Sequence, residues 1–210
     1  MWLGVLVGTL GVAGCTAGSA TEAPTTPARS STTSTPATPE PSPTLPSAPT
    51  SSAAPTSGPD QDVTKSPARP EALDGPATED NAIAVAKYFA ALVTYVTATG
   101  DFAEWDALSG SECKFCASVR EQAVAIHRAG SRSVGGAVDL GFGSAFDNGD
   151  GSFVASVELT EHPSRVVSAD GDVLEEVPEA AAYRATMVLG HSADGWVVKG
   201  VQVDDIDVAS

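Results

Sequence analysis

Basic residues are scarce in this chain of 210 residues, which has 11 Lys and Arg residues against 27 Asp and Glu residues. The formal net charge is −16. Recognition of nucleic-acid phosphates needs a cationic surface, so the composition argues against a nucleic-acid partner. Electrostatic adsorption to anionic lipid is disfavoured for the same reason. The acidity is explained most simply as a contribution to solubility.

Sequence motifs of the common catalytic sites are missing as well. The chain has no glycine-rich phosphate loop, no G-x-S-x-G elbow and no H-E-x-x-H zinc motif. The stretch DNGDG at residues 147–151 lacks the alternating carboxylates and the later glutamate of a calcium-binding EF-hand loop. Glycine and asparagine in a hairpin turn explain that stretch. We therefore assign no catalytic residue, no metal site and no cofactor from the sequence.

Aromatic residues other than Trp2 are absent before Tyr88, and the preceding stretch is mostly Ser, Thr, Pro and Ala. A segment with so little to bury cannot offset the entropy cost of becoming ordered. We therefore expect residues 15–77 to form a disordered linker, which its prolines bias toward extended polyproline II. One globular domain is expected at residues 78–210, long enough to bury a proper core.

The first fifteen residues, MWLGVLVGTLGVAGC, are apolar but too short for a bilayer-spanning helix, which needs about 20 residues. They are typical of the hydrophobic part of a signal peptide. The four residues at positions 12–15 resemble the bacterial lipobox, in which the cysteine is diacylated and becomes the mature N-terminus. The resemblance implies a signal peptide at residues 1–14, a lipid on Cys15 and a location on the extracytoplasmic face of the cell membrane. No Lys or Arg precedes Cys15, and we expect basic residues upstream of the printed start.

Hydrophobic periodicity predicts three helices in succession. The first begins near Thr78 and ends at Gly100, because four apolar residues fall on one helical face: Val85, Phe89, Leu92 and Val96. A short helix is expected over DFAEWDALS at residues 101–109, with Asp101 as its cap. A third is expected from about Cys113 to Ala129, with Gly130 as its stop.

From Ser133 onward the hydrophobic period changes from helical to alternating. In VGGAVDLGF at residues 134–142, Leu140 and Phe142 are expected on the same face of one strand. Further strands are expected over residues 152–160, 183–190 and 195–203, with a hairpin around residues 169–171. The pattern predicts an α+β fold with three N-terminal helices packed on a curved antiparallel sheet of four to six strands.

This order of elements resembles the nuclear-transport-factor-2-like fold, also called the SnoaL-like cone. More narrowly, the lipobox, the Ser/Thr/Pro-rich linker and TGDFAEWDALSGSECKFC at residues 99–116 resemble an actinobacterial lipoprotein family classed as a domain of unknown function. The resemblance covers residues 78–205 and the lipobox. It implies a location and a fold, since the family has no agreed activity.

Cys113 and Cys116 form a C-x-x-C motif at the start of the third helix. If Cys15 carries lipid, they are the two remaining thiols, and they lie outside the cytoplasm, where disulfides persist. Residues at this spacing in a first helical turn have Cα atoms about 5–6 Å apart, which is within disulfide range. The favoured interpretation is a structural disulfide.

Two alternatives for this motif stay open at the level of the sequence. A redox site is conceivable because the helix N-terminus and Lys114 would both lower a thiolate pKa. Thioredoxin-like enzymes, however, place the motif directly after a strand. A metal site would need two more ligands, and the three histidines are spread over the domain at His127, His162 and His191.

A cone-like fold can enclose a pocket between sheet and helices, and relatives with this fold use it as isomerases, dehydratases or cyclases. Proton transfer there needs a carboxylate or histidine together with a donor such as a tyrosine hydroxyl. Residues of suitable type are Tyr88, Tyr95, Trp105, Asp106, His127 and Tyr183. Core packing of the aromatic residues and surface exposure of the others explain the same set.

Taken together, these features predict a lipid-anchored, surface-displayed, non-catalytic binding or accessory domain of the bacterial cell envelope. Its partners would be the membrane, through the N-terminal lipid, and an envelope protein, a wall polymer or a small apolar ligand. The alternative is a small pocket enzyme of the isomerase or hydrolase kind. A thiol-disulfide oxidoreductase is a less favoured third hypothesis.

Overall fold

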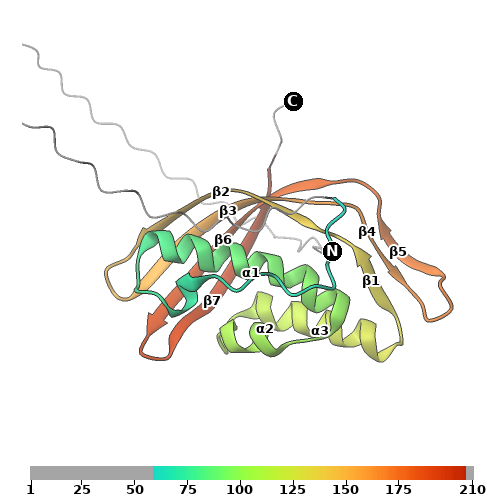
Figure 1. The fold of residues 1–210 in the computed structure, drawn as a ribbon, viewed down its shortest axis with the longest axis horizontal. Coiled ribbons are helices and arrows are strands. Elements are labelled where there is room, and N and C mark those ends of the chain that lie inside the picture. Colours follow the sequence, from blue (N-terminus) through green and yellow to red (C-terminus); the bar gives the residue numbers. More distant parts are fainter. Residues whose placement is uncertain (1–58, 207–210) are drawn as a thin grey trace, which may run out of the picture. The chain divides into compact units, whose positions relative to one another are not determined.

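Helices precede all the strands in the part of the chain that the computed structural model describes, residues 59–206 (Figure 1). The signal peptide expected at residues 1–14, the lipid site Cys15 and most of the linker expected at residues 15–77 lie outside the described residues. The helical elements are the 3-10 helix η1 (Glu71–Asp74), α1 (Glu79–Thr99), α2 (Ala103–Leu108) and α3 (Lys114–Arg128).

Seven strands follow the helices in the described residues and form two antiparallel sheets. A four-stranded sheet has the order β2-β3-β6-β7 and a three-stranded sheet has the order β1-β4-β5. The strands are β1 (Arg132–Gly135), β2 (Val138–Asp147), β3 (Ser152–Glu161), β4 (Ser164–Val167), β5 (Val173–Val177), β6 (Ala181–Ser192) and β7 (Gly195–Asp205). The expected α+β class is confirmed, but the expected single sheet of four to six strands is replaced by two sheets.

The division into two sheets begins at Gly135 and Gly136, inside the stretch expected as one strand. Both glycines have positive φ, 78° and 75°, a conformation that other residues adopt only at a cost. A Cβ atom at Gly135 would also lie 2.5 Å from the carbonyl oxygen of Pro163. The chain therefore turns between β1, which pairs with β4, and β2, which pairs with β3.

Helix α1 has the ends that the sequence predicts. The hydroxyl oxygen of Thr78 accepts a hydrogen bond from the backbone N–H of Asn81 at 3.2 Å, which satisfies one of the free donors of the first turn. Gly100 ends the helix with a φ of 71°. Glu79 and Asp80 lie in the first turn, where negative charge complements the helix dipole.

Within residues 59–206, α1 is the one helix whose length and apolar composition would suit a membrane span. Its contacts identify it as the core helix of the domain instead, because Val85, Phe89, Leu92 and Val96 are completely buried. It lies across one face of the four-stranded sheet (Figure 1). On that face, strand β3 contributes Phe153, Ala155, Val157 and Leu159, and the alternation expected for residues 152–160 is confirmed.

Phe142 is 70% exposed and does not share the inner face with Leu140, contrary to the expectation from alternation. A β-bulge between Leu140 and Gly143 adds an extra residue to β2 and reverses the side of the sheet on which the following residues lie. Phe146, further along β2, is exposed for the same reason. A bulge leaves no signal in an alternating hydrophobic pattern.

The structured part begins before Thr78, in the segment expected to be linker. Ala72 and Leu73 of η1 are buried against the domain core. The indole N–H of Trp196 donates a hydrogen bond to the carbonyl of Ala72 at 3.0 Å. The side-chain amide of Asn81 donates to the carbonyl of Pro76 at 2.8 Å. Two apolar residues between Pro and Gly give no periodic signal, so the sequence alone missed this segment.

Candidate functional site

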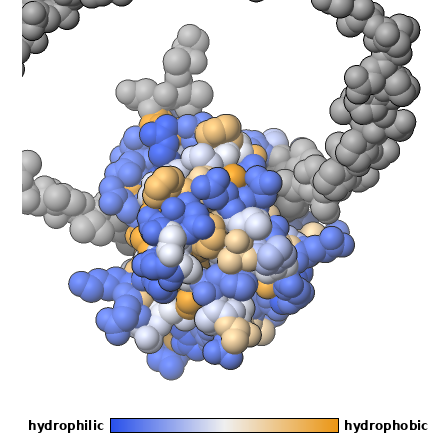
Figure 2. Space-filling model, turned by 90° about the vertical axis from the view of Figure 1, so that its left-hand side faces the viewer, coloured by the Kyte–Doolittle hydropathy of each residue, from blue (hydrophilic) through white to orange (hydrophobic). Residues whose placement is uncertain are grey.

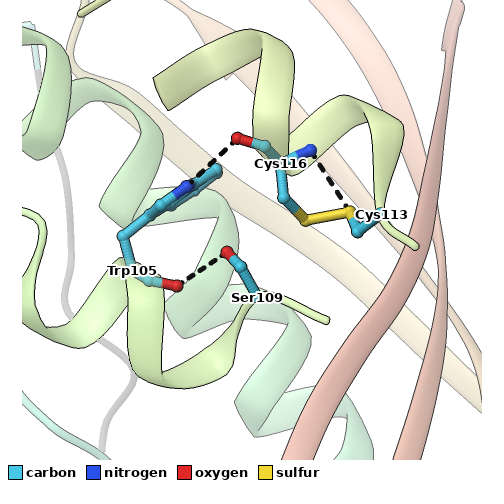
Figure 3. The surroundings of a disulfide bond; sticks show 4 residues. All are labelled: Trp105, Ser109, Cys113 and Cys116. Atoms are coloured by element: carbon cyan, nitrogen blue, oxygen red, sulfur yellow. Dashed lines mark hydrogen bonds between the residues drawn. A yellow bond between two sulfur atoms is a disulfide. The ribbon is translucent and has the colours of Figure 1, made fainter. Parts of the chain in front are cut away.

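Cys113 and Cys116 are joined by a disulfide bond, as expected, with their Cα atoms 5.2 Å apart (Figure 3). Cys113 is the N-cap of α3, and its sulfur accepts a hydrogen bond from the backbone N–H of Cys116 at 3.2 Å. Each cysteine is only 2% exposed. The C-x-x-C motif therefore lies inside the domain rather than on its surface.

The disulfide belongs to a small network that joins α2, α3 and β7. The indole N–H of Trp105 on α2 donates to the carbonyl of Cys116 at 3.3 Å, and the Ser109 hydroxyl donates to the carbonyl of Trp105 at 2.6 Å (Figure 3). The backbone N–H of Gly110 donates to the carbonyl of Val198 on β7 at 2.9 Å. The disulfide thus fixes the loop between α2 and α3 where that loop contacts the sheet.

Burial of both cysteines favours a structural role over a redox role. Thiol-disulfide exchange requires a thiolate to reach one of the sulfur atoms, and catalytic cysteines are accordingly at least partly exposed. Here the disulfide lies at the start of α3, facing the side on which α2 carries the buried ring of Trp105.

We expect the free energy of unfolding to fall by about 2 kcal/mol when this disulfide is removed, since a loop this short constrains the unfolded chain only modestly. Urea denaturation of the protein with and without reductant measures the effect. The double variant Cys113→Ser/Cys116→Ser should match the reduced protein and should not respond to reductant. Equal stability of the oxidised and reduced forms, together with turnover in an insulin-reduction assay, would contradict the structural role.

The six residues proposed to line an internal pocket do not converge on one cavity. Trp105 is completely buried and stacks on Phe89, with ring centroids 4.4 Å apart. Asp106 is exposed and accepts two hydrogen bonds from Arg120, at 2.9 and 3.2 Å. The hydroxyl of Tyr95 donates to Asp101 at the surface, at 2.8 Å.

Tyr183 lies on β6, where burial, and secondarily the charges of Glu161 and Asp205, raise its phenol pKa. The three histidines are equally dispersed. The Nε2 atom of His127 lies 3.1 Å from the carbonyl oxygen of Thr97, and that of His162 lies 2.7 Å from an oxygen of Asp139. Across residues 59–206, no group of three or more His, Cys, Asp or Glu side chains is arranged to hold a metal ion.

A surface groove of about 590 Å³ lies between the segment at residues 69–75, helix α2 and the β6–β7 turn. Its polar and charged lining side chains include Arg69, Asp74, Glu104, His191 and Asp194, and Trp196 also lines it. Figure 2 views the domain from the end that carries the β2–β3 and β6–β7 turns and shows hydrophilic residues with hydrophobic ones interspersed. We take this groove as the candidate functional site.

Of the six residues expected to line a pocket, Tyr88 is the one that helps to form the groove, because its side chain contacts Glu104. Its hydroxyl donates to a Glu104 oxygen at 3.4 Å. Burial, and then the neighbouring Glu104 carboxylate, raise the pKa of Tyr88 to about 12. The phenol therefore stays protonated at neutral pH and acts as a fixed donor that orients Glu104 at the groove wall.

Helix η1 and the residues around it also line the groove. Arg69 forms an ion pair with Asp74 at 3.2 Å, and this exposed pair contributes little to stability. Trp196 is 4% exposed, and the ring of His191 meets it edge-on with centroids 4.8 Å apart. The sequence could not predict this site, because its walls come from three segments that lie far apart in the chain.

The model of a family of unknown function, DUF6318, matches residues 49–202. The chain belongs to this family. The matched range includes η1, all three α-helices and nearly all of the strands, so the groove and the disulfide both lie within the family domain. No curated protein matches this DUF6318 chain.

Two solved structures resemble the DUF6318 domain at low sequence identity. The crystal structure of the intermembrane space region of chloroplast protein ARC6 has a TM-score of 0.49 at 8% sequence identity, covering 63% of this chain and 100% of that chain. An uncharacterized protein with a cystatin-like fold from Caulobacter vibrioides has a TM-score of 0.39 at 14% identity, covering 62% of this chain and 89% of that chain. At such low scores we assign no function from either.

Proposed function

We propose that this protein is a lipid-anchored, non-catalytic binding or accessory domain on the extracytoplasmic face of the bacterial cell membrane. The observation that carries this proposal is that the space between the helices and the four-stranded sheet is filled by apolar side chains. These are chiefly Phe89, Trp105, Phe153, Met187 and Leu189, each less than 2% exposed. A pocket enzyme of the isomerase or hydrolase kind would need a substrate and titratable groups in that space.

The proposed location has support from two separate features. The lipobox-like residues ending at Cys15 are the expected site of diacylation, and two acyl chains give stable anchoring where one does not. The disulfide between Cys113 and Cys116 suits an oxidising compartment outside the cytoplasm. We further propose that the protein is an actinobacterial lipoprotein with a nuclear-transport-factor-2-like cone, in line with its helices followed by antiparallel strands.

The groove is the proposed partner site. Its lining is mainly polar, which favours a wall polymer or an envelope protein over a small apolar ligand. The carboxylates of Glu104 and Asp194 form no ion pair with a described residue, so both can accept hydrogen bonds from a partner. Arg69 is already neutralised by Asp74, which leaves the groove with an excess of negative charge.

Co-sedimentation with purified cell-wall sacculi, still carrying their wall polymers, tests this function. A soluble form beginning at residue 16 should sediment with the sacculi. The double variant Glu104→Gln/Asp194→Asn should bind about tenfold more weakly, because it removes two charged acceptors. The matched variant Glu112→Gln/Glu121→Gln, which removes the same charge before and on α3, should bind like the wild type. Absence of wild-type binding would exclude a wall polymer as the partner, and equal losses of binding in both variants would contradict the assignment of the groove.

A further inference from the structure

Strand β5 presents a free edge at the end of the three-stranded sheet. It pairs with β4 on one side, and no described strand pairs with its other side. Figure 1 shows the β4–β5 hairpin reaching away from the three helices, beyond β1. An edge of this kind offers unpaired backbone N–H and C=O groups with which another strand can pair.

Apolar side chains on β5 are exposed, whereas those on β4 are buried. Val173 and Leu174 are 54% and 61% exposed, while Val166 and Val167 on β4 are 7% and 5% exposed. A bulge between Val166 and Val167 leaves Leu174 without a partner residue on β4. The hairpin is therefore held to the domain through β4, and β5 has apolar side chains free to contact another chain.

Negative charge surrounds these apolar side chains. The hairpin and the residues just after it carry five carboxylates, none of which forms an ion pair with a described residue: Asp170, Asp172, Glu175, Glu176 and Glu179. Arg165, opposite Glu176 in the β4–β5 pair, is the nearest basic residue in the register. An anionic strand edge selects for a cationic partner and against an anionic one.

We propose that the β5 edge binds a basic, extended segment of a partner protein, which adds as a fourth strand to the β1-β4-β5 sheet. Backbone hydrogen bonds along β5 would supply affinity, and Val173 and Leu174 would contact apolar residues of that segment. Lysine or arginine side chains of the segment would meet Glu175 and Glu176. A second copy of this chain is the wrong occupant, because pairing β5 with itself would place these glutamates against each other.

This inference concerns a surface separate from the groove and does not depend on the lipid anchor. The test uses the soluble form beginning at residue 16 and a fluorescein-labelled peptide of alternating lysine and valine. Fluorescence anisotropy should show saturable binding. The same peptide with its alternate amides N-methylated keeps every charge but loses the hydrogen bonds of one strand edge. It should bind at least about tenfold more weakly.

Variants of the protein locate the site. Glu175→Gln/Glu176→Gln should weaken binding of the lysine–valine peptide about tenfold, through loss of the charge pair on the face that carries the lysines and of local negative potential. The control Glu112→Gln/Glu121→Gln should bind as the wild type does. Absence of peptide binding, equal affinity for the N-methylated peptide, or equal losses in the two variants would each overturn the proposal, the last two by showing a non-specific charge effect.

Discussion

Replacing Cys15 by alanine should abolish the incorporation of a clickable fatty acid into this protein when it is expressed in bacteria. The sulfur of Cys15 is the atom that would accept diacylglycerol as a thioether, and alanine has no group that can replace it. The expected effect is complete rather than graded. It is measured by in-gel fluorescence of the labelled protein after lysis, compared with the wild type at equal expression.

The other two cysteines provide the control for this experiment. A Cys113→Ala/Cys116→Ala variant should keep its fatty-acid label, because both residues are buried in the folded domain and joined to each other. A label that persists in the Cys15→Ala protein would contradict the lipoprotein assignment.

Trp105→Ala should lower the free energy of unfolding by about 3–5 kcal/mol, the usual range for removing a large buried aromatic side chain. The Trp105 side chain is completely buried, stacks on Phe89 and donates a hydrogen bond to the carbonyl of Cys116. Alanine would leave a cavity between α1, α2 and α3 and would remove the indole hydrogen bond to the Cys116 carbonyl. Urea denaturation followed by far-ultraviolet circular dichroism measures the loss.

Two matched variants show whether this loss arises from burial. Phe146→Ala removes an aromatic ring that is 65% exposed, and it should change stability by no more than about 0.5 kcal/mol. Trp105→Phe keeps a ring beside Phe89 but loses the indole hydrogen bond. Its loss in free energy of unfolding should therefore lie between the losses of Phe146→Ala and Trp105→Ala. A Trp105→Ala protein as stable as Phe146→Ala would show that the core does not depend on this stack.

The parts of this structure that sequence could predict are those governed by local periodicity and spacing. The recurrence at three and four residues that places Phe89, Leu92 and Val96 on one face of α1 is a direct consequence of helical geometry. The spacing of Cys113 and Cys116 in a first helical turn likewise brings their Cα atoms to bonding distance. In both cases the relevant atoms are neighbours along the chain.

Features that depend on distant segments could not be predicted in this way. The groove requires Arg69, Glu104 and Asp194 to meet, and no local pattern links these residues. Tyrosine and tryptophan at helical spacing are compatible with either a packed core or a pocket lining. Only tertiary contacts show that Trp105 packs in the core.

The attachment of η1 gives the domain a particular response to mechanical tension. All of the chain between Cys15 and the domain enters through residues 59–70, immediately before η1. A pull between an anchored N-terminus and a partner held in the groove would therefore act first on Leu73 and on the hydrogen bond between Trp196 and Ala72. These contacts are few, whereas the strands behind them are held by long antiparallel ladders. Tension would thus detach η1, which forms one wall of the groove, before it disturbs the sheet. A partner bound in the groove would then be released while the rest of the domain stays folded.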